Sequence, residues 1–438
     1  MTGLDKVIKI DVISVPFSGH LFPTLTLVKP LLEDPRFQIR VITGYQKKKL
    51  VEKIGFDCVA LFPDRPTVME DIANTSKQAK PHIMYQQLIA NSKLIPEVID
   101  EIKRIWESDG KPDLIIADFI AAPAGILADR LGIPWITTLP SPVAIESRTT
   151  TPAYLGGWKP HQGILYKCRD ALGRQIIRMA KRIGFALVKR NLKNLQDFKL
   201  YREDGTETIY SPYSILALGI KELEFRDDFP SHLKWVGYRC LSFDKLPKEQ
   251  EQYFTTSQKR VLVTCGTHLK WEKERMVKLA KMLSQEYPDY HFYVTLGNPS
   301  GLQNPPHHLN NNLLLFDYLP YTDILDKMDF VIHHAGSGIL MGCIEQGIPS
   351  LILPQDFDQF DNALRAELAQ VGLVSRKKTE SEVLDLFQAL ISQKDWSKLH
   401  SLTQISKAYQ PTEILYQEIE RSSASTSRPV SSAKQSMP

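Results

Sequence analysis

The chain has 438 residues, of which 43% are hydrophobic and 24% are charged. This length is normal for two domains, and the composition excludes a disordered or fibrous protein. No apolar run approaches the roughly 20 residues of a membrane span, so we expect a cytoplasmic protein that lies, at most, peripherally at the inner membrane surface. The five cysteines show neither CxxC pairs nor metal-ligand spacing: Cys58, Cys168, Cys240, Cys265 and Cys343.

The net charge of +4 is unevenly distributed. Between Lys159 and Arg202 there are twelve Lys and Arg residues and two Asp residues, so this segment carries +10 and the rest of the chain sums to −6. Such asymmetry predicts an anionic partner for one surface. It does not indicate a protein that binds nucleic acid.

In chain order, the first half alternates between strand and helix patterns. The predicted strands are 7–15, 37–43, 113–118, 134–139, 214–220 and 233–236, and the predicted helices are 22–32, 83–105 and 122–131. This alternation predicts a parallel sheet that is covered by helices on both faces. Residues 141–207 interrupt it with a turn-rich stretch and a basic helical run.

A polar stretch at 241–259 indicates a linker, after which the alternation starts again. The predicted strands are 260–264, 291–296, 312–316, 330–333 and 350–353, and the predicted helices are 272–286, 321–328, 338–346 and 359–372. We therefore expect domains at 1–240 and 260–409, a final helix at 410–421, and a disordered tail at 422–438. Two such α/β halves predict a cleft between them, with ligands beyond the carboxyl ends of the strands.

The segment 333–363 carries the strongest chemical signal in the second half. It combines a strand ending in histidine, a glycine-containing turn, and a helix whose first amides have no partners. Gly336, Ser337 and Gly338 at this turn predict a phosphate site, because free amides and the positive end of a helix dipole attract anions. Asp358 and Gln359, at the start of the next helix, can bind sugar hydroxyls just beyond the phosphates.

This segment resembles the nucleotide-sugar signature of family 1 glycosyltransferases. The resemblance rests on His334, Gly336, Gly347, Pro349, Pro354, Asp358–Gln359 and Asn362–Ala363. It implies the GT-B fold: two doubly wound Rossmann-like domains that face each other across a cleft, with the acceptor in the first, the donor in the second, and the final helix crossing back. The alternative is a generic βαβ unit with turn glycines.

The resemblance also implies the roles of individual residues on the donor side. His334 and nearby amides hold the diphosphate, and Asp358 and Gln359 hold the hexose. An aromatic at the position of Tyr318 stacks on the base, although a core tyrosine at a strand end is an equal alternative. The turn at Gly266 and Thr267 resembles the family's phosphate-contacting turn, or it simply ends a strand.

Two positions depart from the family pattern. Relatives usually have Ser or Thr where this chain has Ile339, and an acid that binds the ribose where it has Gly342. Glu345, one helical turn later, is the candidate to replace that acid. UDP-glucose is the default donor by family resemblance, and no metal or other cofactor is expected.

The first half supplies a candidate base. His20 follows a strand and a glycine at the start of the first helix, where the helix N-terminus is expected to keep the imidazole neutral. A hydroxyl acceptor needs such a base, because it is a poor nucleophile until its proton can leave. Asp118 ends another strand and can orient the imidazole. The family uses a His and an Asp in these two contexts.

The basic helical run places Leu172, Ile176, Met179, Ile183 and Leu187 at helical spacing. One interpretation is an amphipathic helix whose apolar face packs on the core and whose basic face lies in water. The other is a basic surface that meets an anionic lipid or acceptor. The second interpretation predicts peripheral membrane contact through 159–202.

Taken together, the sequence predicts an inverting glycosyltransferase that moves a hexose, by default glucose, from a nucleotide diphosphate to a hydroxyl of a hydrophobic acceptor. A GT-B epimerase or phosphorylase is a second possibility, against which Asp358, Gln359 and His20 argue. A non-catalytic sugar-nucleotide binder is a third, motivated by Ile339 and Gly342.

Overall fold

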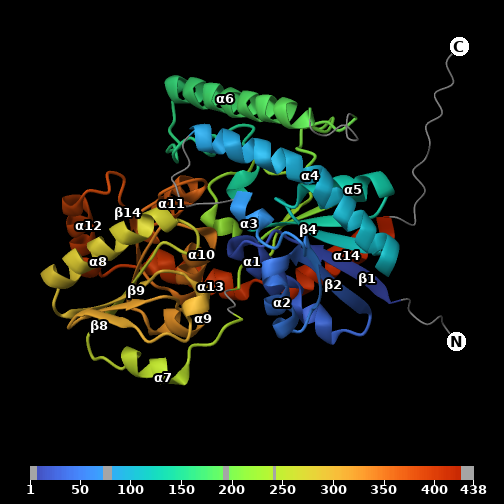
Figure 1. The fold of residues 1–438 in the computed structure, drawn as a ribbon. Coiled ribbons are helices and arrows are strands. Elements are labelled where there is room, and N and C mark those ends of the chain that lie inside the picture. Colours follow the sequence, from blue (N-terminus) through green and yellow to red (C-terminus); the bar gives the residue numbers. More distant parts are fainter. Residues whose placement is uncertain (1–6, 73–80, 191–196, 240–242, 426–438) are drawn as a thin grey trace, which may run out of the picture.

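The computed structural model describes residues 7–72, 81–190, 197–239 and 243–425. Two lobes lie side by side, each built around a seven-stranded sheet (Figure 1). The first lobe contains strands β1 to β7 and the second contains β8 to β14. The predicted architecture of two doubly wound α/β domains is confirmed.

The first sheet is parallel throughout, in the order β3-β2-β1-β4-β5-β6-β7. Its strands are β1 (Ile8–Ile13), β2 (Phe37–Gly44), β3 (Asp57–Leu61), β4 (Leu114–Asp118), β5 (Trp135–Leu139), β6 (Ser214–Ala217) and β7 (Leu233–Trp235). The chain builds outward in both directions from β1 and β4, so these two neighbours form the switch point where α/β sheets bind ligands.

Helices cover both faces of this sheet. They include α1 (Ser18–Val28), α2 (Lys48–Ile54), α3 (Val68–Ile72), α4 (Pro81–Asp109), α5 (Ala122–Leu131) and α6 (Ile164–Lys189). Alternate residues of β4 enter opposite cores: Ile115 packs with α4 and α5, whereas Ile116 packs with α1 and the C-terminal helix. This period of two explains why β4 is apolar along its length, as a strand buried on both faces must be.

The second sheet has the order β10-β11-β9-β8-β12-β13-β14, in which β10 is an antiparallel edge strand. Its strands are β8 (Lys259–Thr264), β9 (Tyr290–Thr295), β10 (His307–Asn310), β11 (Leu313–Phe316), β12 (Phe330–His333), β13 (Ser350–Ile352) and β14 (Gly372–Val374). Here the switch point lies between β8 and β12. The histidine-glycine turn and the turn at Gly266 follow these two strands.

The helices of the second lobe surround that sheet. They include α7 (Lys248–Glu251), α8 (Lys273–Glu286), α9 (Tyr321–Ile324), α10 (Ser337–Gln346), α11 (Gln359–Leu368), α12 (Glu380–Ser392) and α13 (Ser397–Ala408). The predicted helix 359–372 is too long, because α11 ends at Leu368 and Gly372 begins β14.

The predicted linker is not a free connection where the structure describes it. Leu246 and Phe254 are buried in the core of the second lobe. Gln250 donates from Nε2 to the carbonyl oxygens of Leu302 and Asn304, at 2.8 and 2.9 Å. Three scattered anchoring residues in a polar segment leave no periodic signal, so the sequence pattern missed this packing.

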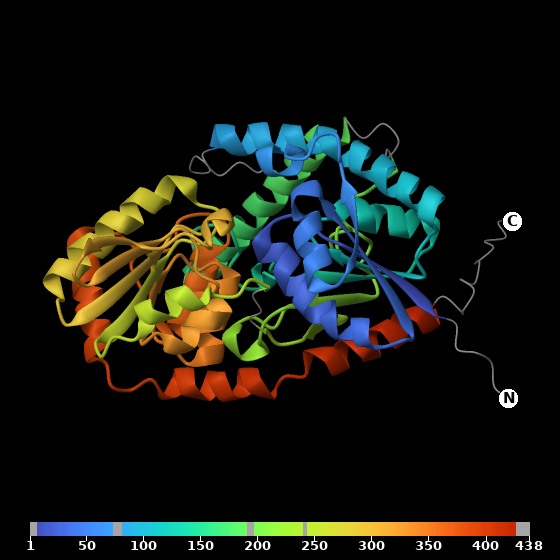
Figure 2. The same ribbon diagram turned by 60° about the horizontal axis from the view of Figure 1, so that its bottom comes forward.

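The C-terminal helix α14 (Pro411–Ser425) returns to the first lobe. Figure 2 shows α13 and α14 running along one edge of the molecule, from the second lobe to the first. Leu415 and Ile419 are buried in the core of the first lobe. The helix continues past the predicted end at Arg421 to Ser425, and the rest of the predicted tail, 426–438, lies outside the described residues.

Helix α6 has the opposite orientation to the first interpretation of the basic run, whereas peripheral membrane contact stays a prediction. Six of its apolar side chains point away from the protein, and 48–80% of each is exposed. We call them the outer apolar face of α6: Ile164, Leu165, Leu172, Ile176, Met179 and Ile183. Arg178 and Lys181 instead point inward, toward Glu146. Within the described residues, no helix is long and apolar enough to cross a membrane.

Candidate active site

His20 and Asp118 meet at the switch point of the first sheet. His20 is the third residue of α1, which follows β1, and Asp118 is the last residue of the neighbouring strand β4. The imidazole Nδ1 lies 3.1 Å from Asp118 Oδ2. Asp118 is fully buried and its Oδ1 accepts a hydrogen bond from the Ile120 amide, whereas 21% of the His20 side chain is exposed. The buried carboxylate thus fixes a partly accessible imidazole.

The electrostatic environment raises the pKa of His20. Burial acts to lower it, but the charge and hydrogen bond of Asp118 and the charge of Asp358 together outweigh burial. The helix N-terminus is expected to favour the neutral imidazole, whereas these two carboxylates favour the protonated form. Two carboxylates, one from each lobe, make His20 a stronger base than a free histidine.

At the switch point of the second sheet, the turn between β12 and α10 contains two histidines with different environments. His333 is fully buried, and its Nδ1 accepts a hydrogen bond from the Ala335 amide at 3.0 Å. This bond helps to hold Ala335 in the left-handed region, at φ 67°. His333 thus shapes the turn, and His334 is the histidine beside the glycines.

The His334 ring occupies a slot between two glycines. A Cβ added to Gly266 would lie 2.9 Å from the ring's Cε1, and one added to Gly336 would lie 2.5 Å from its Nε2. Burial, followed by the charge of His268, lowers the pKa of His334 to about 4. Its Nδ1 is buried and has no hydrogen-bond partner within the described structure. A neutral, half-buried ring beside these two glycines fits a hydrogen-bonding role toward an anion.

His268 is the site residue that the sequence analysis missed. It follows Gly266 and Thr267 after β8, and its ring centroid lies 5.6 Å from that of Phe17 in the first lobe. Burial and then the charge of His20 lower its pKa to about 4. The only signal in the sequence was its position directly after the turn at Gly266. His20, His268 and His334 therefore lie near one another, although they come from three separate segments.

The loop before α11 also reaches the cleft. The carboxylate of Asp358 accepts hydrogen bonds from the Ser141 hydroxyl of the first lobe and, at 3.2 Å, from Asn362 Nδ2. Gln359 is buried, and its Oε1 accepts from the amides of Gln355 and Asp356, at 2.9 and 3.1 Å. In this arrangement Asp358 lies at the interface between the lobes, whereas the Gln359 oxygen stabilises its own loop.

The remaining predicted donor residues surround the first turn of α10. Ser337 and Gly338 begin this helix, where three amides have no partner within the helix. Thr267 and Tyr318 are half-buried, and Tyr318 lies in the turn that follows β11.

The two departures from the family pattern are both buried. Ile339 belongs to the core of the second lobe, and Gly342 lies inside α10. The carboxylate of Glu345 lies 3.9 Å from the guanidinium of Arg239. This residue is thus part of an ion pair.

Further contacts join the two lobes. Arg365 of α11 donates to both carboxylate oxygens of Glu224, at 2.7 and 3.0 Å, and both side chains are buried. Asp361 accepts from the Tyr154 amide at 2.8 Å, and burial raises the pKa of this carboxyl to about 6.

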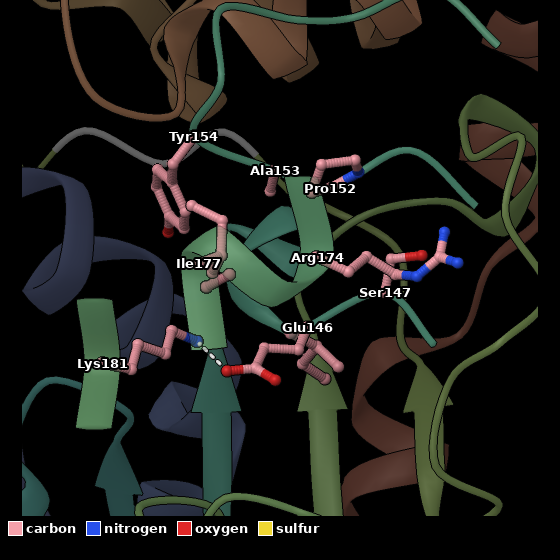
Figure 3. Close-up of a pocket in the computed structure, with 10 residues that line it drawn as sticks. Glu146, Ser147, Pro152, Ala153, Tyr154, Arg174, Ile177 and Lys181 are labelled. Carbon is pink, nitrogen blue, oxygen red and sulfur yellow. Dashed lines mark ion pairs between the residues drawn. The ribbon is translucent and has the colours of Figure 1, made fainter. Parts of the chain in front are cut away.

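A small pocket lies under α6 in the first lobe. Figure 3 shows Ile177 and Lys181 of α6 facing Glu146, Pro152 and Tyr154. A neighbouring pocket shares Glu146 and is also lined by Tyr210. Tyr210 stacks on Phe119, and Phe119 lies 5.6 Å from the His20 ring. A continuous aromatic path therefore joins these pockets to His20.

Among the described residues, no group of three or more His, Cys, Asp or Glu side chains could hold a metal ion. Whether the reaction proceeds without one stays a prediction.

Comparisons with known proteins agree with this arrangement. The family described as "Erythromycin biosynthesis protein CIII-like, C-terminal domain" matches residues 294–398, in the second lobe. The NDP-glycosyltransferase YjiC of Bacillus subtilis (strain 168) is 24% identical, over 89% of this chain and 91% of its own. The UDP-glucosyltransferase A1 of Starmerella bombicola is 25% identical, over 82% of this chain and 80% of its own.

A solved structure is similar over nearly the whole chain. The crystal structure of the glycotransferase of kitacinnamycin aligns with a TM-score of 0.70 at 20% identity, and covers 96% of this chain and 100% of that one. This likeness shows the same fold. With the sequence relatives, it identifies the chain as a glycosyltransferase of the GT-B fold that is similar to the family 1 UDP-glycosyltransferases.

Proposed function

We propose that the chain transfers a hexose, with inversion, from a nucleotide diphosphate sugar to a hydroxyl of a hydrophobic acceptor. The observation that carries this proposal is the His20–Asp118 pair, which lies at the edge of the first sheet and senses the charge of Asp358 from the second lobe. A base on one lobe and a sugar-binding carboxylate on the other is the arrangement that a single displacement requires.

His20 acts as the general base. Asp118 holds Nδ1, so Nε2 takes the proton of the acceptor hydroxyl as that oxygen attacks the anomeric carbon. The imidazolium that forms is stabilised by Asp118, whose charge already raises the pKa of His20. One attack from the side opposite the nucleotide inverts the anomeric centre.

The second lobe stabilises the leaving diphosphate. The unpaired amides at the start of α10 and the neutral ring of His334 supply hydrogen-bond donors without a metal, and Gly266, Thr267 and Ser337 border the same space. Asp358 binds hexose hydroxyls, and Gln359 supports that loop. Tyr318 is the candidate to stack on the base. The names of the relatives, which include an NDP-glycosyltransferase and a UDP-glucosyltransferase, support UDP-glucose as the donor.

A hydrophobic acceptor is supported by the aromatic path from His20 through Phe119 to Tyr210. This path leads to the pockets beneath α6, whose walls include Ile145 and Ile177. Aromatic walls bind flat or apolar molecules and leave only the reacting hydroxyl to be positioned by polar groups.

The competing proposal is a protein that binds sugar nucleotides without catalysis. It is motivated by Ile339 and Gly342, which remove a hydroxyl and an acid that relatives use. A panel of nucleotide sugars, each tested for hydrolysis with and without chelator, separates the two. We expect slow, chelator-insensitive release of UDP from UDP-glucose, and loss of that release in His20→Ala. Tight UDP-glucose binding with no hydrolysis, and no transfer to any of a set of hydroxylated aromatics, would favour the binder.

A further inference from the structure

Helix α6 presents an apolar surface to the outside of the molecule. Figure 1 shows α6 lying over α4 at the periphery of the first lobe, with no other labelled element beyond it. At about 1.5 Å per residue, its 26 residues make a cylinder of roughly 39 Å. From Leu165 to Ile183 the outer apolar face of α6 recurs at spacings of seven, four, three and four residues, so its members lie in one stripe along this cylinder.

The inward side of α6 explains why the stripe must point outward. Lys181 Nζ lies 3.1 Å from a Glu146 oxygen (Figure 3) and 2.8 Å from a Glu207 oxygen, and Arg178 lies 3.2 Å from Glu146. Glu146 and Glu207 are nearly buried, so turning the helix over would leave both carboxylates without their cations. Breaking a buried pair in this way is costly. The exposure of the stripe is therefore built into the fold.

The charge around the stripe is positive. Asp170 is the only acidic residue between Ile164 and Lys189, and it is buried. Arg182 is exposed, and its position on the helix places it beside the stripe. Lys167 is also exposed, near the start of the helix, but lies on the same side as Arg174 and Arg178. An apolar stripe with exposed cations and no exposed acids on its helix matches the boundary between the headgroups and the acyl chains of an anionic bilayer.

We propose that the outer apolar face of α6 docks on the surface of an anionic lipid bilayer, with the helix axis parallel to the membrane plane. Pairing with α6 of a second copy is disfavoured, because it would bring two helices of like charge together. The proposal differs from a basic surface that binds lipid: Arg178 and Lys181 hold the helix, and the apolar side chains enter the membrane. It does not depend on the reaction that the cleft catalyses.

The test is flotation of the full-length chain with vesicles of phosphatidylglycerol and phosphatidylcholine, compared with phosphatidylcholine alone. We expect binding to the anionic vesicles, and a loss on the order of 10-fold in the Leu172→Gln/Met179→Gln variant, because both side chains would enter the bilayer. Leu131→Gln/Leu368→Gln is the matched control, because these leucines are 42% and 43% exposed but lie on α5 and α11. The control should bind like the wild type.

A fluorophore on Cys168 reports the orientation, because this cysteine is exposed on α6 whereas Cys58, Cys265 and Cys343 are buried. In a Cys240→Ser background, an environment-sensitive label should shift to the blue with anionic vesicles and not with neutral ones. Lys167→Gln/Arg182→Gln should reduce vesicle binding and its sensitivity to salt.

Equal recovery of wild type and the Leu172→Gln/Met179→Gln variant with anionic vesicles would overturn the proposal. So would a lipid-free dimer, seen by sedimentation, that this variant dissociates while the vesicles recruit no protein. If the Leu172→Gln/Met179→Gln variant loses vesicle binding while its UDP-glucose hydrolysis equals that of the wild type, the docking surface is supported. This outcome does not depend on whether the proposed function is correct.

Discussion

One histidine lies at the switch point of each sheet, and the environments of the two histidines act in opposite directions. His20 follows β1 at the switch point of the first sheet, and His334 follows β12 at the switch point of the second. The pKa of His20 is raised by Asp118 and Asp358 against the effect of burial, whereas burial and His268 lower the pKa of His334 to about 4. The same architecture thus yields a base on one side and a neutral ring on the other.

The difference shows what each lobe contributes. In the first, a buried carboxylate supplies charge to a side chain that must gain a proton. In the second, two glycines remove side chains so that a neutral ring and backbone amides approach an anion closely. A histidine whose protonated form is stabilised is useful for accepting a proton, and one that stays neutral binds the donor independently of pH.

The largest expected effect comes from His20→Ala. Removal of a general base lowers the rate by about 10²–10⁴-fold, and we expect this loss in kcat with little change in UDP-glucose affinity measured by calorimetry. His20→Gln, which keeps a polar side chain but no comparable base, should be equally slow. Turnover near that of the wild type would show that His20 is not the base, and the contrast between His20 and His334 would then have no role in catalysis.

The next prediction concerns the buried ion pair between Glu224 and Arg365, which joins the two lobes. Glu224→Gln removes the buried carboxylate that pairs with Arg365, so we expect the free energy of unfolding to fall by about 3–5 kcal/mol, measured by denaturant titration. Glu367→Gln is the matched control: its pair with Lys159 also joins the lobes but is exposed, and we expect at most about 1 kcal/mol. Similar midpoint shifts in both variants would show that burial does not distinguish the two contacts.

A single methyl group tests the slot around His334. In Gly336→Ala the new Cβ would lie 2.5 Å from the ring's Nε2, so the ring must move and nucleotide affinity should fall by roughly 10-fold or more. Gly19→Ala, beside His20 in α1, meets nothing within 4 Å and should leave nucleotide affinity unchanged. UDP titrations decide, and a silent Gly336→Ala would mean that the ring position is unimportant for the donor.

The pH profile of kcat/KM should report the raised pKa of His20. Because the base acts in its neutral form, activity should rise with pH through a midpoint above the ordinary histidine value of 6.5. In Asp118→Asn the imidazolium loses its stabilising charge, so the midpoint should move to lower pH, with a smaller loss of rate than in His20→Ala. An unmoved midpoint would show that Asp118 does not control this titration.

The smallest effect is expected on the donor side. With a pKa of about 4, His334 stays neutral above pH 5.5, so UDP-glucose affinity should change by less than about twofold between pH 5.5 and 8. The measurement uses the His20→Ala variant to prevent turnover, and intact UDP-glucose because its diphosphate does not titrate in this range. A steep loss of affinity as the pH rises would mean that a protonated histidine binds the donor.

Much of the fold and part of the site followed from local pattern. Strand and helix periodicities located both sheets, and His20 and Asp118 were selected because each follows or ends a strand. Strands β3, β10 and β14 and the packing of Gln250 were missed, since short edge elements and scattered anchors have no clear period. His268 was missed for a similar reason, because nothing near it in sequence marks it as part of the cleft.

The sequence by itself determined the order of the elements, the positions of the strand ends, and the amphipathic character of α6, because these depend on neighbours along the chain. Only the tertiary structure decided which face of α6 points outward, because Glu146 and Glu207 lie far from Lys181 in sequence. The tertiary structure likewise decided the opposite pKa directions of His20 and His334. Each pKa depends on charges and burial that other segments supply. The effect of a charge depends on its distance in space and not on its separation along the chain.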